Sequence, residues 1–427
     1  MHPFLHRTLL VVGAMQCWCV PQLLLAQDLS ALTELAEGAI LGENVADPVP
    51  GFDIRILKDG QPIFHQAFGN WTIDQPARAD SSTKTLSGAL MMSLAESAEG
   101  GFSLESHLSD FLPEYDKEGY RDITIRQAFS HTSGLPSEGG TSPILIRTDI
   151  TLRQAAWLIS FRPLENGPPG STFGYGGISM HAAGAAAEVA TGESFVDLMA
   201  ERITGPLEMA NTRFVTASDA NPRVAGGMES TASEFSRFMD MLLNGGEDRV
   251  TGTRILSEDS VEEMFTRVTE DTTPIDFSPV ENNRYGIGVW LDQLDQAGPP
   301  VDVLAAGGRG FHSWIDQSHG LVFTLATDTT RITNIEELSS QMHLAILEAV
   351  ADPGDLNLDG SVDRADLSLW ASQYGVSEDG DGFLAWQRGV EADASVANVP
   401  EPRGGLALFL FLLLKSLSLR TRNSPVA

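Results

Sequence analysis

The order of strand-like and helix-like segments along residues 29–350 constrains the fold more than any other feature. Five segments have the pattern of strands: 51–60, 61–69, 285–291, 311–315 and 321–327. The first alternates apolar and polar residues as a half-buried strand does, and Asp59-Gly60 is a hairpin turn signal. Mostly helical sequence separates the early strands from the late ones. We therefore expect an α/β (α+β) fold, in which one antiparallel sheet joins the two ends of this region and is flanked by helices and a mostly helical subdomain.

Three helices are predicted with some detail. They span about 29–40, 82–100 and 335–350. In the second, Leu86, Leu90 and Leu94 recur at helical spacing, and Gly100-Gly101 ends the pattern. This buried helix begins at the second of a pair of serines, Ser81-Ser82.

The composition excludes some classes of function. The 427 residues include 27 Lys and Arg against 58 Asp and Glu, a formal charge of −31. Such acidity argues against nucleic acid or an anionic membrane surface as a partner. The two cysteines, Cys17 and Cys19, both lie near the start, so the remaining chain has no disulfide and no cysteine metal site.

The first 26 residues are typical of a secretory signal. His2 and Arg7 precede an apolar stretch, and the small residue Ala26 marks a plausible cleavage point. Pro21 within this stretch disfavours a stable membrane span. We expect an exported protein located in the periplasm, at the cell surface or outside the cell.

Ser81-Ser82-Thr83-Lys84 is the candidate nucleophile motif. A serine needs a neighbouring base, and a lysine three residues later lies on the same helix face. Burial would lower the lysine's affinity for a proton. No other lysine in the chain has a serine three residues before it. The alternative is that Ser81 or Ser82 merely caps the helix.

Several further motifs occur in a fixed order after this one. They are Ile123–Pro136 with its ending His-Thr-Ser-Gly-Leu-Pro, Pro169-Gly170, Tyr175, Thr191-Gly192, Pro206-Leu207, Ser230–Glu234, Leu243–Gly246 and Tyr285–Gly288. With Ser81–Thr85 and the hairpin residues Lys58–Gly60 and Phe68-Gly69, this order resembles the serine β-lactamase and penicillin-binding-protein family. That family includes class C β-lactamases, D-alanyl-D-alanine carboxypeptidases and esterases.

The resemblance implies roles for particular residues. Ser81 would attack a carbonyl and form an acyl-enzyme, and Lys84 would help to deprotonate it. Tyr175 would be a second base or proton shuttle, with its phenol made more acidic by Lys84. His131 would shape the wall behind the site. No cofactor is expected for catalysis.

Two departures from the family pattern affect the substrate site. The family has Asn two residues after the tyrosine, where this chain has Gly177. The third motif of the family begins with lysine or histidine, whereas the matching region, Ala305–Asp316, has neither at that place. Gly307 or Gly308 could supply a backbone N–H to an oxyanion hole together with Ser81. Arg309 or His312 could replace the lost cation.

Residues 355–366 have the spacing of a calcium loop. Asp355, Asn357, Asp359, Asp363 and Asp366 occupy positions one, three, five, nine and twelve, with Gly360 at position six and the Ser361 carbonyl at position seven. The stretch resembles a dockerin-type repeat. A second repeat from Glu378 lacks a full ligand set, so we expect one Ca²⁺. The alternative is an acidic linker.

The end of the chain resembles a Pro-Glu-Pro sorting signal. Pro400-Glu401-Pro402 precedes the apolar run 406–414, and Arg420 and Arg422 follow. The run is short for a membrane span, so a processed tail that contacts the membrane only transiently fits better. We expect four parts: a signal (1–26), a hydrolase (27–350), a dockerin-like segment (351–392) and a linker with sorting tail (393–427).

The sequence thus predicts an exported serine hydrolase that acts on a small-molecule or peptidoglycan-type ester or amide, as an esterase, a D-alanyl peptidase or a weak β-lactamase. The alternative is a binding module that has lost turnover through Gly177 and the altered third motif. The dockerin-like segment could bind a protein partner.

Overall fold

The computed structural model describes residues 28–137, 142–280, 282–293, 300–377 and 380–396. The predicted signal (1–26) and the predicted sorting motif at Pro400–Pro402 lie outside these residues. Among the residues that are described, no helix is both long and apolar enough to cross a membrane.

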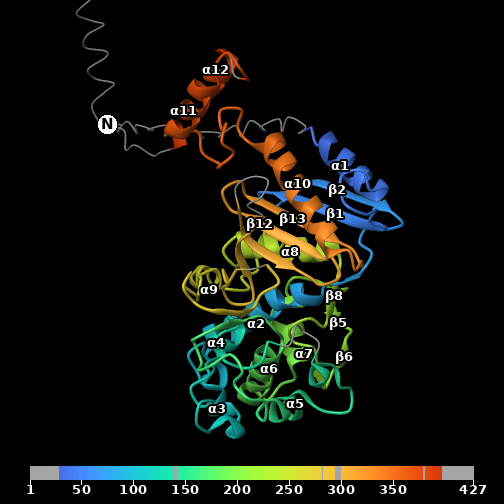
Figure 1. Cartoon of the computed structure of the whole chain (residues 1–427), viewed down its shortest axis with the longest axis vertical. Coiled ribbons are helices and arrows are strands. Elements are labelled where there is room, and N and C mark those ends of the chain that lie inside the picture. The colour runs from blue at the N-terminus through green and yellow to red at the C-terminus, as the bar shows by residue number, and fades with distance from the viewer. Residues whose placement is uncertain (1–27, 138–141, 281, 294–299, 378–379, 397–427) are drawn as a thin grey trace, which may run out of the picture.

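A six-stranded antiparallel sheet joins the two ends of the region 29–350 (Figure 1). Its strands, in spatial order, are β10 (Trp290–Gln293), β11 (Val301–Ala306), β12 (His312–Asp316), β13 (Leu321–Ala326), β1 (Gly51–Lys58) and β2 (Gln61–Gly69). The late strand β13 pairs with the early strand β1, with Asp53 opposite Ala326. The predicted closure of the sheet by the two chain ends is therefore confirmed.

Helices pack on both faces of this sheet. α1 (Ser30–Leu41) and α10 (Ile332–Val350) cover one face. Leu32 and Leu338 are buried there in one apolar core with strand residues such as Phe52. α8 (Ala232–Leu243) covers the other face, where Phe235 joins a second core. This second core continues into the predicted helical subdomain.

The subdomain is built mainly from short helices around the long helix α2. Its helices are α2 (Thr83–Ser97), α3 (Leu108–Phe111), α4 (Ile125–Phe129), α5 (Leu152–Ile159), α6 (Ile178–Thr191), α7 (Phe195–Met199) and α9 (Glu258–Met264). Single turns are η1 (Asp80–Ser82), η2 (Glu99–Gly101), η3 (Pro113–Tyr115), η4 (Pro143–Ile146) and the π-turn η5 (Ala200–Thr204). Short strands are β3 (Ala77–Arg78), β4 (Phe173–Gly174), β5 (Arg213–Phe214), β6 (Ala217–Ser218), β7 (Asn221–Pro222), β8 (Met228–Ser230) and β9 (Ile275–Phe277).

The prediction of a strand over 285–291 is wrong in its first half. Residues 285–289 form a turn in which the Gly286 N–H bonds Val289 O at 2.9 Å, and the strand starts only at Trp290. Gly288 adopts φ +77° and passes so close to α2 that a Cβ would lie 2.3 Å from the Lys84 carbonyl oxygen. Glycine is therefore required at this contact. The sequence analysis also missed β11.

The C-terminal segment follows α10, which ends at Val350. The loop with calcium-type spacing leads into α11 (Arg364–Gln373), and α12 (Gly380–Val396) follows. The region of the weak second repeat is helical from Gly380 onward.

Candidate active site

Ser81 lies on the short turn η1 at the start of α2, partly exposed. Its neighbour Ser82 is fully buried, and its Oγ donates to Ala305 O at 3.1 Å. The side chain of Ser82 makes no cap hydrogen bond to α2. Ser82 therefore ties the turn to β11, while Ser81 is the serine that a substrate can reach.

Lys84 is buried beside Ser81, with 2% of its surface exposed. Its Nζ donates to Ser81 Oγ at 3.1 Å and to Ala225 O at 2.9 Å. Burial, reinforced by the positive charge of Arg223 and opposed by Asp80, lowers the pKa of Lys84 to about 7. The predicted lowering by burial is confirmed, and the amine can exchange a proton near neutral pH.

Tyr175 completes this group. Its hydroxyl hydrogen-bonds with Ser81 and with Trp290, and Lys84 Nζ lies 4.6 Å from the centre of its ring. Burial raises the pKa of Tyr175 to about 12, more than its hydrogen bonds and Arg223 lower it. The prediction that Lys84 makes this phenol more acidic is therefore wrong. Tyr175 is a neutral hydroxyl near pH 7.

His131 packs among aromatic rings behind the site. Its ring centre lies 4.6 Å from that of Tyr175 and 4.7 Å from that of Tyr285. Burial, together with the charge of Lys84, lowers the pKa of His131 well below its usual range. A neutral ring in this cluster fits the expected role in the wall of the site.

The glycine turn of the third motif lies against the residues that precede Ser81. A Cβ on Gly307 would come 2.2 Å from Ala79 O, and one on Gly308 would lie 3.5 Å from the Asp80 carboxylate. The Gly307 N–H is already used by Phe311 O at 2.7 Å. Gly308 is thus the better placed of the two glycines to offer an N–H to an oxyanion.

His312 does not face the site as a cation. His312 and Trp314 are two residues apart on β12, so their side chains lie on the same face of the sheet. The indole N–H of Trp314 donates to Ser339 of α10 at 3.1 Å, which makes this the α10 face. His312 is 2% exposed, and burial lowers its pKa to about 4. The prediction that His312 contacts the substrate is wrong, because strand alternation turns this side chain away.

Gly177 is the N-cap residue of α6 and lies close to Leu145 and Ala225. A Cβ there would lie 3.0 Å from Leu145 Cδ1 and 3.3 Å from Ala225 Cβ. Apolar groups thus occupy the space that the family's asparagine would enter. The carbonyl of Ala225 accepts a hydrogen bond from Lys84 in place of a side-chain amide.

Arg223 is the cation that the sequence analysis missed. Its charge acts on the ionisation of Lys84, Tyr175 and Asp80, and its guanidinium donates to Gly226 O at 3.3 Å. Arg309, in contrast, is paired with Asp328. Nothing in the spacing around Arg223 marks it, because the approach to Lys84 arises only from tertiary packing.

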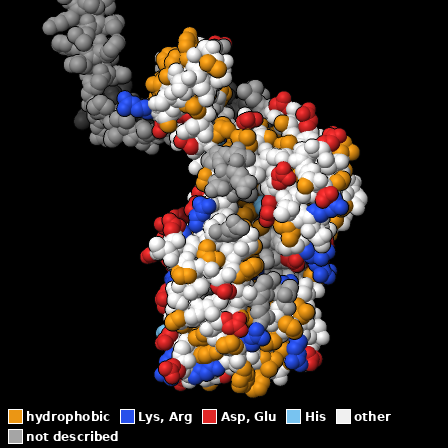
Figure 2. All heavy atoms as spheres, viewed as in Figure 1, with side chains coloured by type: hydrophobic (Ala, Val, Ile, Leu, Met, Phe, Trp, Pro, Cys, Tyr) orange, Lys and Arg blue, Asp and Glu red, His pale blue; other side chains and the backbone are white. Residues whose placement is uncertain are grey.

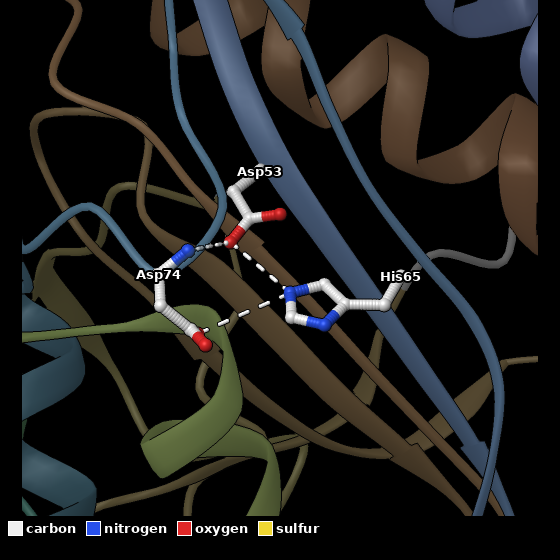
Figure 3. Close-up of side chains that lie close together, drawn as sticks. All are labelled: Asp53, His65 and Asp74. Carbon is white, nitrogen blue, oxygen red and sulfur yellow. Dashed lines mark hydrogen bonds and ion pairs between the residues drawn. The ribbon is translucent and has the colours of Figure 1, made fainter.

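A compact polar cluster of Asp53, His65 and Asp74 lies at the first hairpin (Figure 3). His65 Nε2 is 3.3 Å from Asp53 Oδ2 and 3.9 Å from Asp74 Oδ1. The fully buried Asp53 also accepts the Asp74 N–H at 2.7 Å. The cluster ties β1 and β2 to the loop that leads toward Ser81, and the sequence analysis did not predict it.

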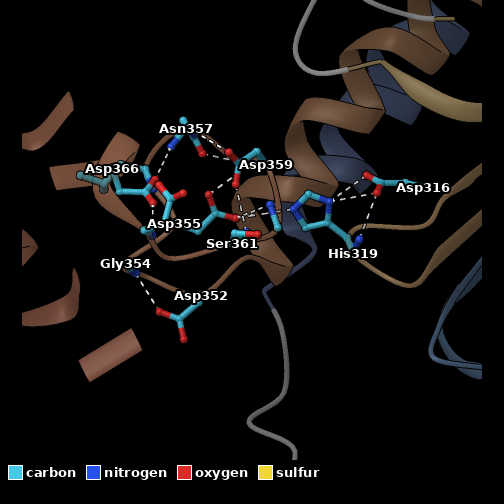
Figure 4. Close-up of polar contacts among 12 residues, drawn as sticks. Asp316, His319, Asp352, Gly354, Asp355, Asn357, Asp359, Ser361 and Asp366 are labelled. Carbon is cyan, nitrogen blue, oxygen red and sulfur yellow. Dashed lines mark hydrogen bonds and ion pairs between the residues drawn. The ribbon is translucent and has the colours of Figure 1, made fainter. Parts of the chain in front are cut away.

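The calcium-type loop has the predicted oxygen side chains on one turn (Figure 4). Asp355 accepts N–H groups of Asp359 at 3.1 Å and Gly360 at 2.9 Å, and Asp366 accepts those of Leu356 and Asp363 at 2.8 Å each. Gly360 has φ +85°, as a sharp turn at position six requires.

The loop's donor set fits a hard cation, although its carboxylates are not drawn together. The ligand atoms of Asp53, His65 and Asp74 all lie within 4.8 Å of one another. Within the described residues, no three carboxylates of the loop come this close together. Burial, with the charges of Asp366 and Asp359, raises the pKa of Asp355. The negative charges therefore oppose one another, and a cation would have to draw them inward.

Curated proteins match part of this chain. Protein flp of Staphylococcus aureus (strain N315) is 25% identical over 197 residues, which are 43% of this chain and 39% of that protein. The chain thus spans well under half the length of this curated relative.

Solved structures share the fold. EstCE1, described as a hydrolase with promiscuous acyltransferase activity, superposes with a TM-score of 0.61 at 18% identity, covering 74% of this chain and 99% of that one. A D-stereospecific amidohydrolase from Streptomyces sp. gives 0.55 at 23% identity, covering 73% and 97%.

Residues 39–337 match the family described as β-lactamase. This range contains the sheet, the helical subdomain and all the residues grouped around Ser81. On this match, the chain belongs to the β-lactamase family.

Proposed function

We propose that this chain is an exported serine hydrolase that cleaves an ester or amide through an acyl-enzyme on Ser81. The observation that carries the proposal is the 3.1 Å contact between Ser81 Oγ and Lys84 Nζ, made by a buried lysine whose pKa is about 7. A lysine in this state accepts the hydroxyl proton as the nucleophile attacks.

Each neighbour of Ser81 has a role in this mechanism. Neutral Lys84 takes the proton of Ser81 Oγ while the oxygen bonds to the substrate carbonyl. Tyr175, whose neutral hydroxyl is hydrogen-bonded to Ser81, relays a proton to the leaving group. The N–H groups of Ser81 and Gly308 stabilise the oxyanion. Water then hydrolyses the acyl-enzyme by the same proton route.

The substrate we favour is a simple ester or a peptidoglycan-type amide over a β-lactam. Family members bind the drug's carboxylate through the lysine or histidine of the third motif, and this chain has alanine at Ala305 and Ala306. A structure described as a family VIII carboxylesterase and one described as an amidohydrolase share the fold, which is compatible with either leaving group.

The test is hydrolysis of a p-nitrophenyl ester by the full chain and by Ser81→Ala. We expect the variant to lose turnover and keep its fold. Ser97→Ala, at the exposed end of the same helix, is the matched control and should retain activity. Full activity of Ser81→Ala would remove the proposal and favour the binding module as the alternative.

We also propose that the loop of Asp355, Asn357, Asp359, Ser361, Asp363 and Asp366 binds one Ca²⁺. Two observations support this proposal. The loop has the oxygen donors that Ca²⁺ prefers, and backbone N–H groups of the loop donate to the carboxylates of Asp355 and Asp366 and so orient them. The ion would neutralise the mutual repulsion of the carboxylates. We also propose that the protein is exported and that its tail is processed. The support for this is the sequence of residues 1–26 and of the end of the chain.

A protein partner is proposed for the helices that follow this loop. Apolar side chains gather on this part of the surface (Figure 2): Tyr374 and Val376, in the connection after α11, are 59% and 91% exposed, and Leu384 of α12 is 45% exposed. Exposed apolar groups of this kind are typical of interaction surfaces.

A further inference from the structure

The calcium-type loop is packed against the hydrolase region of its own chain. It contacts the turn 317–320 between β12 and β13, where a Cβ on Gly360 would lie 2.8 Å from Ser318 O. Leu358 of the loop packs against the apolar core that α1 and α10 form on the sheet. The face of the loop that carries Leu358 and Gly360 is therefore already covered.

A chain of buried polar groups crosses this contact (Figure 4). His319 Nδ1 lies 2.9 Å from Asp316 Oδ2, which is also 3.2 Å from His343 Nε2 of α10. On its other side, His319 Nε2 faces Asp355 Oδ2 at 3.7 Å and has no hydrogen-bond partner among the described residues. His319 and Asp355 are only 6% and 4% exposed.

Asp355 is therefore positioned from two directions. The loop supplies the N–H groups of Asp359 and Gly360, and the hydrolase region supplies His319. Groups that contact a metal-binding side chain without binding the metal themselves orient that side chain and change the affinity of the site for the metal. A ligand held in this way connects the ion site to the sheet.

We propose that the loop is a metal-dependent clamp on the hydrolase region of the same chain, with the turn 317–320 as the surface that it fits. The proposal rests on the calcium site proposed above. An ion that binds the docked loop stabilises the docked fold by mass action. Because the coupling is reciprocal, docking also strengthens binding of the ion. A separate protein partner would have to use another face.

The test is calorimetric unfolding of the full chain with saturating Ca²⁺ and with chelator, beside a calcium titration. We expect Ca²⁺ to raise the Tm of the main transition by about 3–6 °C at a hundredfold excess over Kd. Leu358→Asn keeps every ligand and tolerates the left-handed backbone there, so it should lose at least half of this rise while still binding Ca²⁺. His319→Ala should do the same from the other side.

Val376→Asn is the matched control, because Val376 is 91% exposed in the same segment. It should keep the full rise. Calcium heat without a rise in Tm would overturn the clamp and leave the calcium site intact, as would a full rise in Leu358→Asn. No calcium heat at millimolar concentration would overturn both proposals together.

Discussion

The site around Ser81 and the calcium-type loop are assembled in opposite ways. The site takes Ser81 and Lys84 from one helical turn, but Tyr175, Arg223 and Trp290 come from segments far apart along the chain. The loop takes all its oxygen ligands from the contiguous residues 355–366. One is fixed by packing, and the other by local spacing.

This difference has an energetic consequence. The charged amine of Lys84 is held beside a large apolar core, and its chain neighbours Thr83 and Thr85 are almost entirely buried. The loop concentrates carboxylates that repel one another, and it depends on a cation to balance them. We therefore expect the chemistry to be indifferent to metal and the loop to depend on it.

The largest effect should come from the proton-transfer groups. Lys84→Ala and Tyr175→Phe should each lower kcat/KM for a p-nitrophenyl ester by about 10²–10⁴-fold, the usual contribution of a positioned acid or base. Neither change should alter the calcium heat of the full chain. Loss in only one variant would show that the two groups do not share the proton transfer.

The converse substitution addresses the loop. Asp359→Ala removes a charged ligand, so we expect calcium affinity to fall by at least about tenfold in a calorimetric titration. Ester turnover at 25 °C should be unchanged, because no group near Ser81 is touched. If chelator or this variant abolished turnover at that temperature, the separation of the two regions would be wrong.

The same difference explains what the sequence could predict. The loop ligands, the Ser81–Lys84 spacing and the lowered pKa of Lys84 follow from local pattern and burial. Tyr175 entered only through the family resemblance. Arg223, the indole of Trp290 and the carbonyl of Ala225 could not be anticipated, since only tertiary packing brings them to Lys84 and Tyr175.

The fold shows the same limit. The sheet closed by the chain ends was predictable from where the strand patterns lie. His312 was misplaced because the register of β12, not its distance from Gly308 in the sequence, decides which face it occupies. The turn at 285–289 was misread because Gly286 and Gly288 serve contact with α2 and its surroundings rather than a strand.

A substrate comparison sharpens the account of the altered third motif. We expect a chromogenic cephalosporin to be turned over at least about tenfold more slowly than a simple ester, because a missing charged contact of this kind costs about that much or more. Steady-state rates at matched concentrations give the ratio. Efficient cephalosporin turnover would mean that another group, such as Arg223, anchors the carboxylate.

The smallest expected effect is a shift in pH dependence. The neutral form of Lys84 is the reactive one, so kcat/KM should rise as the pH increases through about 7 and level off above it. We call this rising part of the pH profile the limb. Arg223→Gln removes a charge that lowers the pKa of Lys84, so the limb should move to higher pH. Asp80→Asn removes a charge that raises it, so the limb should move to lower pH.

Arg309→Gln is the control for this pair, since its charge acts on Asp80 but is not among those that shift the pKa of Lys84. It should move the limb least. Shifts of the same sign in Arg223→Gln and Asp80→Asn would show that the limb does not report Lys84.

The most direct test of the account is the position of the covalent intermediate. The full chain is incubated with a fluorophosphonate or a slowly turned-over ester, digested, and the modified peptide is sequenced by mass spectrometry. We predict a single adduct on Ser81, absent in Ser81→Ala and strongly slowed in Lys84→Ala. An adduct on Ser82 or another residue, or turnover of the ester with Ser81 unmodified throughout, would contradict the acyl-enzyme mechanism.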